Sequence, residues 1–151
     1  MRIIYFLIIC AIADLNAKTE VSEKLSNMKS LKSDKVNVRV GPGEDYPIVY
    51  RYLKKGVPVQ VIAEFKSWIK IRDKDGDEGW VANRLLANKH TVIISKNTIL
   101  YTKPLEKSIK LAIVEKGVIA EKVEENSGFL KIKLNTKTGW IKKDDVWGVD
   151  V

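Results

Sequence analysis

Apolar and polar residues alternate with a period of two along most of the chain. Residues 57–61 and 130–134, for example, carry an apolar side chain at every second position. This alternation places the apolar side chains on one face of an extended strand and predicts half-buried β-strands. Asp75-Gly76 interrupts it and predicts a tight hairpin turn, because a type I′ turn needs positive φ at both central residues. After residue 30 no segment combines helical periodicity with capping residues, so the pattern predicts an all-β fold.

The strand pattern occurs twice. In each half of the chain a glycine is followed twelve positions later by an aromatic residue, and then by a Gly-Trp pair. The first copy has Gly56, Trp68 and Gly79-Trp80, and the second has Gly117, Phe129 and Gly139-Trp140. Units of roughly 60 residues can each close a small core, which indicates a tandem duplication rather than a solenoid. We predict two small barrels of about five strands each, at 34–95 and 96–151, with residues 91–95 as the closing strand of the first.

The first 17 residues have the layout of a secretory signal peptide. One positive charge precedes an apolar run of eleven residues, 3–13, and small residues follow it. A transmembrane helix needs roughly 20 apolar residues, so this run predicts no membrane anchor after cleavage. Cleavage fits after Ala17 or after Ala13, and a buried N-terminal strand is the alternative to a signal peptide. The signal predicts export, to the periplasm first and otherwise to the cell surface or the medium. Residues 18–33 then form a polar leader.

The composition argues against catalysis. The 151 residues include one cysteine, Cys10, and one histidine, His90. Cys10 leaves with the signal peptide, so the exported chain would lack the thiol that a Cys-His nucleophile requires. The sequence has neither a Gly-x-Ser-x-Gly nor a His-Glu-x-x-His motif. We therefore expect a protein without enzymatic activity and without a cofactor.

Neither a metal ion nor nucleic acid is an expected partner. Asp73, Asp75 and Asp77 resemble part of a calcium loop, but Gly76 stands at its fourth position rather than at its sixth. The segment therefore predicts a hairpin tip and no metal site. The net charge of +8 is divided between +2 in 18–33, +3 in 34–90 and +3 in 91–151. A nucleic-acid site would gather cations and aromatic residues on one face, so this even spread argues against one.

The motifs of the first copy resemble the bacterial SH3-like (SH3b) domain. These motifs are Val36-Asn37-Val38-Arg39, Gly41-Pro42-Gly43, Tyr46-Pro47, Gly56, Trp68 and Gly79-Trp80-Val81. The whole exported chain is similar to the tandem SH3-like family of bacterial envelope proteins. The resemblance implies SH3-like barrels, export and a non-catalytic interaction role, and related modules bind peptidoglycan stem peptides or target attached hydrolases. The second copy has Tyr101 in place of Arg39 and Lys103-Pro104-Leu105 in place of the glycine-proline turn, so we expect the first copy to bind the ligand.

Five residues of the first copy are candidates for ligand binding: Arg39, Tyr46, Tyr50, Trp68 and Trp80. Alternation along 68–72 places Trp68 beside two cations on the outer strand face, where it contacts a ligand or folds under the loop that carries Tyr46. Trp80 is either a ligand contact or a packing residue in the core or between the units. For Tyr46 and Tyr50, burial and binding are both open. Arg39 either secures the adjacent glycine-proline turn or contacts the ligand.

These features predict an exported, non-catalytic binding module of the cell envelope. Its partner would be a short peptide, a peptidoglycan stem or an envelope protein, held by the first copy. The alternative is a structural platform for the assembly of an envelope complex, in which both barrels act as one rigid surface. Trp147, near the C-terminus, is expected to join the second barrel to the first.

Overall fold

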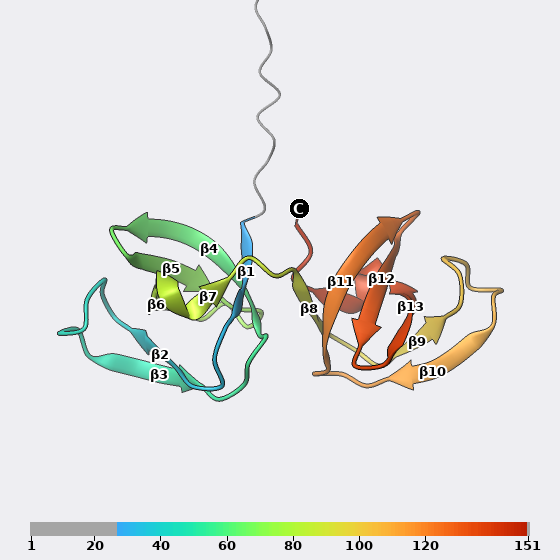
Figure 1. Cartoon of the computed structure of the whole chain (residues 1–151), viewed down its shortest axis with the longest axis horizontal. Helices are drawn as coiled ribbons and strands as arrows, with labels where there is room; N and C mark the ends of the chain where they lie inside the picture. Colours follow the sequence, from blue (N-terminus) through green and yellow to red (C-terminus); the bar gives the residue numbers. More distant parts are fainter. Residues whose placement is uncertain (1–26, 151) are drawn as a thin grey trace, which may run out of the picture.

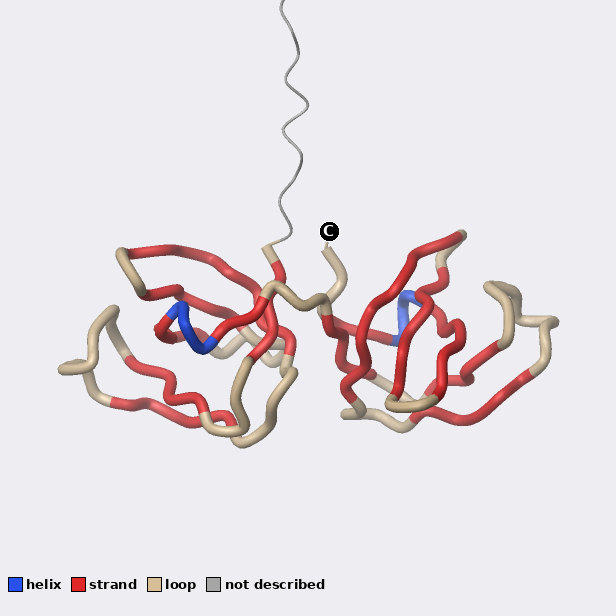
Figure 2. Tube along the Cα trace, viewed as in Figure 1, coloured by secondary structure: helices blue, strands red, loops and turns tan. Residues whose placement is uncertain are grey.

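The computed structural model describes residues 27–150, and β-strands make up most of its regular structure (Figures 1 and 2). The predicted signal peptide and residues 18–26 of the predicted leader lie outside the described residues. Two short 3-10 helices, Asn83–Leu85 and Lys143–Asp145, each precede a final short strand. Within residues 27–150, no helix is long and apolar enough to cross a membrane.

The strands form two antiparallel sheets with the same order. The first runs β3-β2-β6-β5-β4-β1-β7 and the second β10-β9-β13-β12-β11-β8-β14, so every strand has its counterpart seven numbers later. The first sheet consists of β1 (Met28–Leu31), β2 (Val36–Arg39), β3 (Ile48–Tyr52), β4 (Pro58–Phe65), β5 (Trp68–Arg72), β6 (Glu78–Ala82) and β7 (Leu86–Ala87). The second consists of β8 (Thr91–Ile94), β9 (Thr98–Tyr101), β10 (Lys110–Val114), β11 (Ile119–Asn126), β12 (Phe129–Leu134), β13 (Lys137–Lys142) and β14 (Val146–Trp147). The predicted all-β fold is confirmed, with seven strands in each sheet rather than about five.

Each unit encloses a core of its own. The buried positions are those of the period-two pattern: Ile69 and Ile71 of β5 face the first core, and Leu130 and Ile132 of β12 face the second. Complete burial of such a side chain contributes about 1.5–3 kcal/mol to stability. Two separate cores mean that each copy of the repeat buries its own apolar face.

The glycine of each Gly-Trp pair lets two strands approach closely. A Cβ atom at Gly79 would overlap the side chain of Val38 on β2. A Cβ atom at Gly139 would meet Leu100 of β9 at 2.7 Å, closer than real Cβ atoms come. The repeated glycine is thus a packing requirement of both cores.

Two strands differ from the sequence-based assignment: one joins the other unit, and one comes from the expected leader. The expectation that residues 91–95 close the first unit is wrong, because β8 pairs with β11 and β14 of the second sheet. Its counterpart β1, at 28–31, falls in the expected polar leader, yet it pairs with β4 and β7 of the first sheet. Alternation shows which face of a strand is buried but not which sheet the strand joins. The strands of the two units therefore run from 28 to 87 and from 91 to 147.

The two units meet around the chain segment that links β7 to β8 (Figure 1). The hydroxyl Oγ1 of Thr91 donates a hydrogen bond to the carbonyl oxygen of Gly56 at 2.7 Å. Trp147 lines one hollow together with Met28 and another together with Asp75, two residues of the first unit. Trp147 therefore lies at the junction of the two units.

Candidate functional site

A row of side chains crosses the outer face of the first sheet. Trp80 of β6 stands opposite Arg39 of β2 on one side and opposite Lys70 of β5 on the other. Ile48 of β3 extends the row beyond Arg39. Residues directly opposite one another on antiparallel strands project to the same face of the sheet. The row therefore places one tryptophan between two cations, on the side away from the core.

Trp68 lies on the same face as this row. It is two residues before Lys70 on β5 and stands opposite Ala82 of β6 and Phe65 of β4. Trp68 and Trp80 are both half-buried, and neither belongs to the core cluster of the first unit. The structure thus places Trp80 on an outer face, rather than in the core or between the units.

The loop after β2 is tied to the row by Arg39. Its guanidinium atom Nη1 donates a hydrogen bond to the backbone carbonyl of Tyr46 at 2.8 Å. The ring of Tyr46 packs so closely on Gly41 that a Cβ atom there would overlap it. The Tyr46 side chain nevertheless remains 46% exposed. Arg39 therefore secures the loop while it also lies on the outer face beside Trp80.

The outer face carries an excess of positive charge. The carboxylate of Glu78 pairs with Lys70 at 2.9 Å and with Arg72 at 2.5 Å. Hydrogen bonds from Lys70 and Arg72 lower the pKa of Glu78. One carboxylate thus faces two cations, while Arg39 bonds to a neutral carbonyl. The face can therefore attract a carboxylate or another anionic group to the side of Trp80.

The second unit has an equivalent row of different residues, and the aromatic residues of that row are buried. Tyr101 takes the place of Arg39 and stands opposite Trp140, which stands opposite Lys131. The Tyr101 ring packs edge-to-face on Phe129 at a centroid distance of 6.1 Å, and Lys131 Nζ lies 5.7 Å from the Trp140 ring centroid. Tyr101 and Trp140 are only 5% and 7% exposed. Tyr101 thus packs on Phe129, Trp140 lies against Lys131, and both are shielded from the solvent.

An ion pair lies beside the second row. Lys142, opposite Phe129, pairs with Glu106 of the β9–β10 loop at 2.8 Å. A hydrogen bond from its ammonium group to Glu106 raises the pKa of Lys142. In the first unit the position equivalent to Lys142 is Ala82, opposite Trp68. At this position the first row has only the methyl group of Ala82, whereas the second has the long charged side chain of Lys142.

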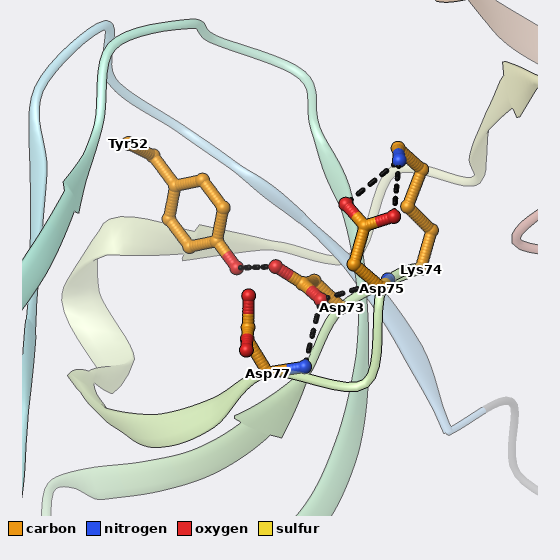
Figure 3. Close-up of polar contacts among 5 residues, drawn as sticks. All are labelled: Tyr52, Asp73, Lys74, Asp75 and Asp77. Carbon is orange, nitrogen blue, oxygen red and sulfur yellow. Dashed lines mark hydrogen bonds and ion pairs between the residues drawn. The ribbon is translucent and has the colours of Figure 1, made fainter.

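Tyr50 lies away from the other four candidates. It stands opposite Val38, and Tyr52 stands opposite Val36, so both tyrosines face the core side of the sheet. Their rings pack edge-to-face at 5.4 Å, and the Tyr52 hydroxyl donates to Oδ2 of Asp73 at 3.0 Å (Figure 3). Burial raises the pKa of both phenols, so both remain neutral donors at physiological pH. This pair closes the barrel against the β5–β6 hairpin.

Asp73 organises that hairpin through its other oxygen atom. Its Oδ1 accepts the backbone N–H groups of Asp75 and Asp77 at 2.9 and 3.0 Å (Figure 3). Gly76 has φ +89°, whereas Asp75 does not adopt positive φ. The two-residue type I′ turn expected at 75–76 is therefore replaced by a five-residue loop, 73–77, built around the Asp73 side chain. Within residues 27–150 no three His, Cys, Asp or Glu side chains are grouped so that they could hold a metal ion.

Two contributors to the outer face were not among the sequence candidates. Lys70 was placed beside Trp68 by alternation, but its position next to Trp80 depends on the pairing of β5 with β6. The alanine side chain of Ala82 suggests no function in the sequence. Its role, to leave the face beside Trp68 free of a long side chain, is recognised only by comparison with Lys142 of the second copy. The pairing register of the two copies is the signal that finds both residues.

A family model named "Bacterial SH3 domain" matches residues 32–88 and again residues 95–148. The chain belongs to the bacterial SH3 domain family. Each matched segment covers all strands of one sheet except its first, β1 or β8, so the duplication is a tandem pair of bacterial SH3 domains.

The chain is similar to parts of longer proteins. The Bacillus subtilis (strain 168) protein named "Putative N-acetylmuramoyl-L-alanine amidase YrvJ" is 27% identical over 128 residues, which cover 77% of this chain and 24% of that protein. The chain thus spans about a quarter of the length of this relative. Among solved structures, NlpC2 from Trichomonas vaginalis matches with 13% identity and a TM-score of 0.38, over 80% of this chain and 47% of that one. An NlpC/P60 family protein from Bacillus cereus ATCC 10987 matches with 16% identity and a TM-score of 0.37, over 82% of this chain and 56% of that one.

Proposed function

We propose that this chain is a non-catalytic cell-wall-binding module whose first unit binds a peptide. The ligand is the peptide stem of peptidoglycan or a peptide segment of an envelope protein. The observation that carries the proposal is the open row Arg39–Trp80–Lys70 of the first unit, whose side chains are partly exposed. In the equivalent row of the second unit, Tyr101 and Trp140 are buried. Family membership supports a binding role, and the name of the amidase relative connects such domains with peptidoglycan.

The row offers complementary contacts to a short peptide. The indole of Trp80 and that of Trp68 provide flat apolar surfaces for the backbone and for aliphatic side chains. The guanidinium of Arg39 has the planar geometry that matches a carboxylate with two parallel hydrogen bonds. Lys70, on the other side of Trp80, is a second cation, although it is paired with Glu78 at 2.9 Å. A peptide with a free carboxylate would therefore lie across β2, β6 and β5.

The proposed cellular setting is the envelope. Residues 1–17 act as a signal peptide, residues 18–26 belong to a polar leader, and the exported chain works in the periplasm or, alternatively, at the cell surface or in the medium. The motivating feature is the short apolar run 3–13 after a single positive charge. Mass spectrometry of the protein from the envelope fraction tests this proposal. A new N-terminus at Lys18 or Asp14 supports it, and an intact Met1 in the cytoplasmic fraction contradicts it.

Pelleting with purified sacculi tests the binding proposal. We expect Arg39→Gln to reduce the pelleted fraction at least about fivefold, since a hydrogen bond to a charged group contributes about 1.5–3 kcal/mol. We expect a similar reduction for Trp80→Ala, because the change removes the aromatic surface on which the peptide would pack. Lys137→Gln, at the exposed start of β13, removes the same charge as Arg39→Gln and serves as the matched control. Equal retention of Arg39→Gln and Lys137→Gln would show that sacculi bind the overall charge and not this face.

A structural platform is the second candidate function, and one feature of the second unit favours it. The edge strand β10 and the residue before it leave three apolar side chains open: Ile109, Leu111 and Ile113 are 72%, 46% and 74% exposed. An edge strand with exposed apolar side chains is a ready surface for another protein. Replacing Ile109 and Ile113 by threonine should abolish a stable envelope complex if the platform function holds. The same change should leave sacculus binding intact if the first unit is the binding module.

A further inference from the structure

Lysine side chains from four separate segments surround a hollow between the two units. The hollow has a volume of about 460 Å³, which lies within the size range of small-molecule sites. Its charged lining residues are Lys32, Lys55, Lys89 and Lys133, with Glu121 as the one carboxylate. These residues are distant in sequence, so the even spread of charge along the chain conceals a local concentration of cations.

Both units build the floor of this hollow. Thr91 at the start of β8 bonds through Oγ1 to the carbonyl oxygen of Gly56, and both residues line the hollow. Gly56 also faces Ile119 of β11, because a Cβ atom there would lie 3.7 Å from Ile119 Cγ2. The hollow is therefore a product of the junction and belongs to neither barrel alone.

Most of the positive charge in the hollow is uncompensated. Lys89 Nζ pairs with Glu121 at 2.8 Å, which uses the one lining carboxylate. Within residues 27–150, the ammonium groups of Lys32, Lys55 and Lys133 have no ion-pair partner. Like charges around a concave surface with low-dielectric walls focus a positive potential and raise the local concentration of anions. The lining thus has a net charge of +3 that a ligand can neutralise.

We propose that this hollow binds a phosphate-bearing ligand with two or more negative charges, such as a segment of a polyphosphate or phosphodiester chain. Lysine binds phosphate as a point charge with rotatable donors, so several lysines around one hollow can contact the many oxygen atoms of a multiply charged phosphate ligand from different directions. The described residues that line the hollow include no arginine, and the amide of Asn135 offers an uncharged donor. This site is separate from the Arg39–Trp80–Lys70 row and does not depend on the proposed peptide binding.

Calorimetric titration of the purified protein with tripolyphosphate at low ionic strength tests the proposal. The variant Lys55→Gln/Lys133→Gln removes one unpaired cation from each unit. Lys103→Gln/Lys107→Gln removes the same charge from the exposed β9–β10 loop, on the far side of the second unit (Figure 1). We expect the first variant to weaken binding at least about tenfold and the control to weaken it less than about twofold, since charge-assisted hydrogen bonds are lost in the first alone.

Three results would overturn the proposal. Equal losses in the two double variants would mean that tripolyphosphate responds to net charge only. Citrate binding as tightly as tripolyphosphate would remove the assignment to phosphate. A lack of tripolyphosphate binding to the unaltered protein would remove the site. Lys32→Gln, which removes a single lining cation, is a second variant and should weaken tripolyphosphate binding less than the double variant does. Trp80 lies outside the hollow, and Trp80→Ala should bind tripolyphosphate like the unaltered protein. Amide NMR spectra check that each variant is folded.

Discussion

Replacing Asp73 by alanine should destabilise the first unit by about 2–4 kcal/mol. The Asp73 carboxylate accepts three hydrogen bonds, from the Tyr52 hydroxyl at 3.0 Å and from the backbone N–H groups of Asp75 and Asp77 at 2.9 and 3.0 Å. A hydrogen bond contributes about 0.5–1.5 kcal/mol net, and bonds to a charged acceptor lie at the upper end of that range or above it. The change also leaves the half-buried Tyr52 hydroxyl without its acceptor, which adds to the loss.

Two further variants separate the parts of this effect. Asp75→Ala alters the same hairpin but removes only an exposed ion pair with Lys74, so we expect a loss of less than about 1 kcal/mol. Tyr52→Phe removes one of the three hydrogen bonds to Asp73. A double-mutant cycle of Asp73→Ala with Tyr52→Phe should therefore give a coupling energy of about 1 kcal/mol.

The assay is urea unfolding followed by amide NMR signals of each unit, because two units with separate cores need not unfold in one transition. The transition of the first unit should move to lower urea in Asp73→Ala, while the transition of the second unit should stay in place. A loss as small as that of Asp75→Ala, or a coupling energy near zero, would refute the view that Asp73 closes the barrel.

Three other predictions follow from the packing and charge of the first unit. Gly79→Ala should lower the free energy of unfolding by about 1–3 kcal/mol, because the new Cβ atom would overlap Val38. An unchanged thermal transition would contradict the close approach of β6 to β2. Ala82→Lys should reduce pelleting with sacculi, because it places a long cation where the second unit has Lys142, whereas Ala82→Ser should preserve pelleting. Equal pelleting of the two variants would contradict binding at the Arg39–Trp80–Lys70 row. The folded-state pKa of Glu78 is lowered below 4.5, so its contribution to stability is present above pH 4.5 and is lost as the pH falls through the folded pKa. Glu78→Gln should therefore lessen the acid sensitivity of the first unit in pH-dependent unfolding, and an identical acid profile would contradict the ion pairs.

The sequence predicted the fold class and the duplication because both depend on local patterns. Period-two alternation identified the buried faces of β5 and β12, and the Gly-Trp spacing related the two copies. The assignment of 91–95 failed because a strand with the same alternation can join either sheet. The hairpin at 73–77 differed because the Asp73 side chain, rather than a pair of positive-φ residues, organises the loop.

The candidate site was predictable in its residue types but not in its arrangement. Arg39, Trp68 and Trp80 share one face, and Tyr46 is bound to that face through its carbonyl oxygen. For Tyr50 the sequence left burial and binding both open, and the pairing of β2 with β3, with its bulge between Val38 and Arg39, turns Tyr50 toward the core. Neighbours along the chain need not share a face, and only the pairing register decides this.

The lysine-lined hollow shows the same limit on a larger scale. Its cations come from the turn after β1, the β3–β4 loop, the β7–β8 linker and β12, four segments that are distant from one another in the sequence. The cluster results from the way in which the two units meet, which no sequence pattern of a single unit records.

An NMR titration with a soluble peptidoglycan stem peptide tests whether the first unit binds the peptide through its open row. We predict that amide and indole signals of Arg39, Lys70 and Trp80 shift in a saturable manner, and that the equivalent signals of Tyr101, Lys131 and Trp140 stay in place. Shifts confined to the second unit, or spread equally over both rows, would contradict the claim that the open face of the first unit is the peptide-binding site.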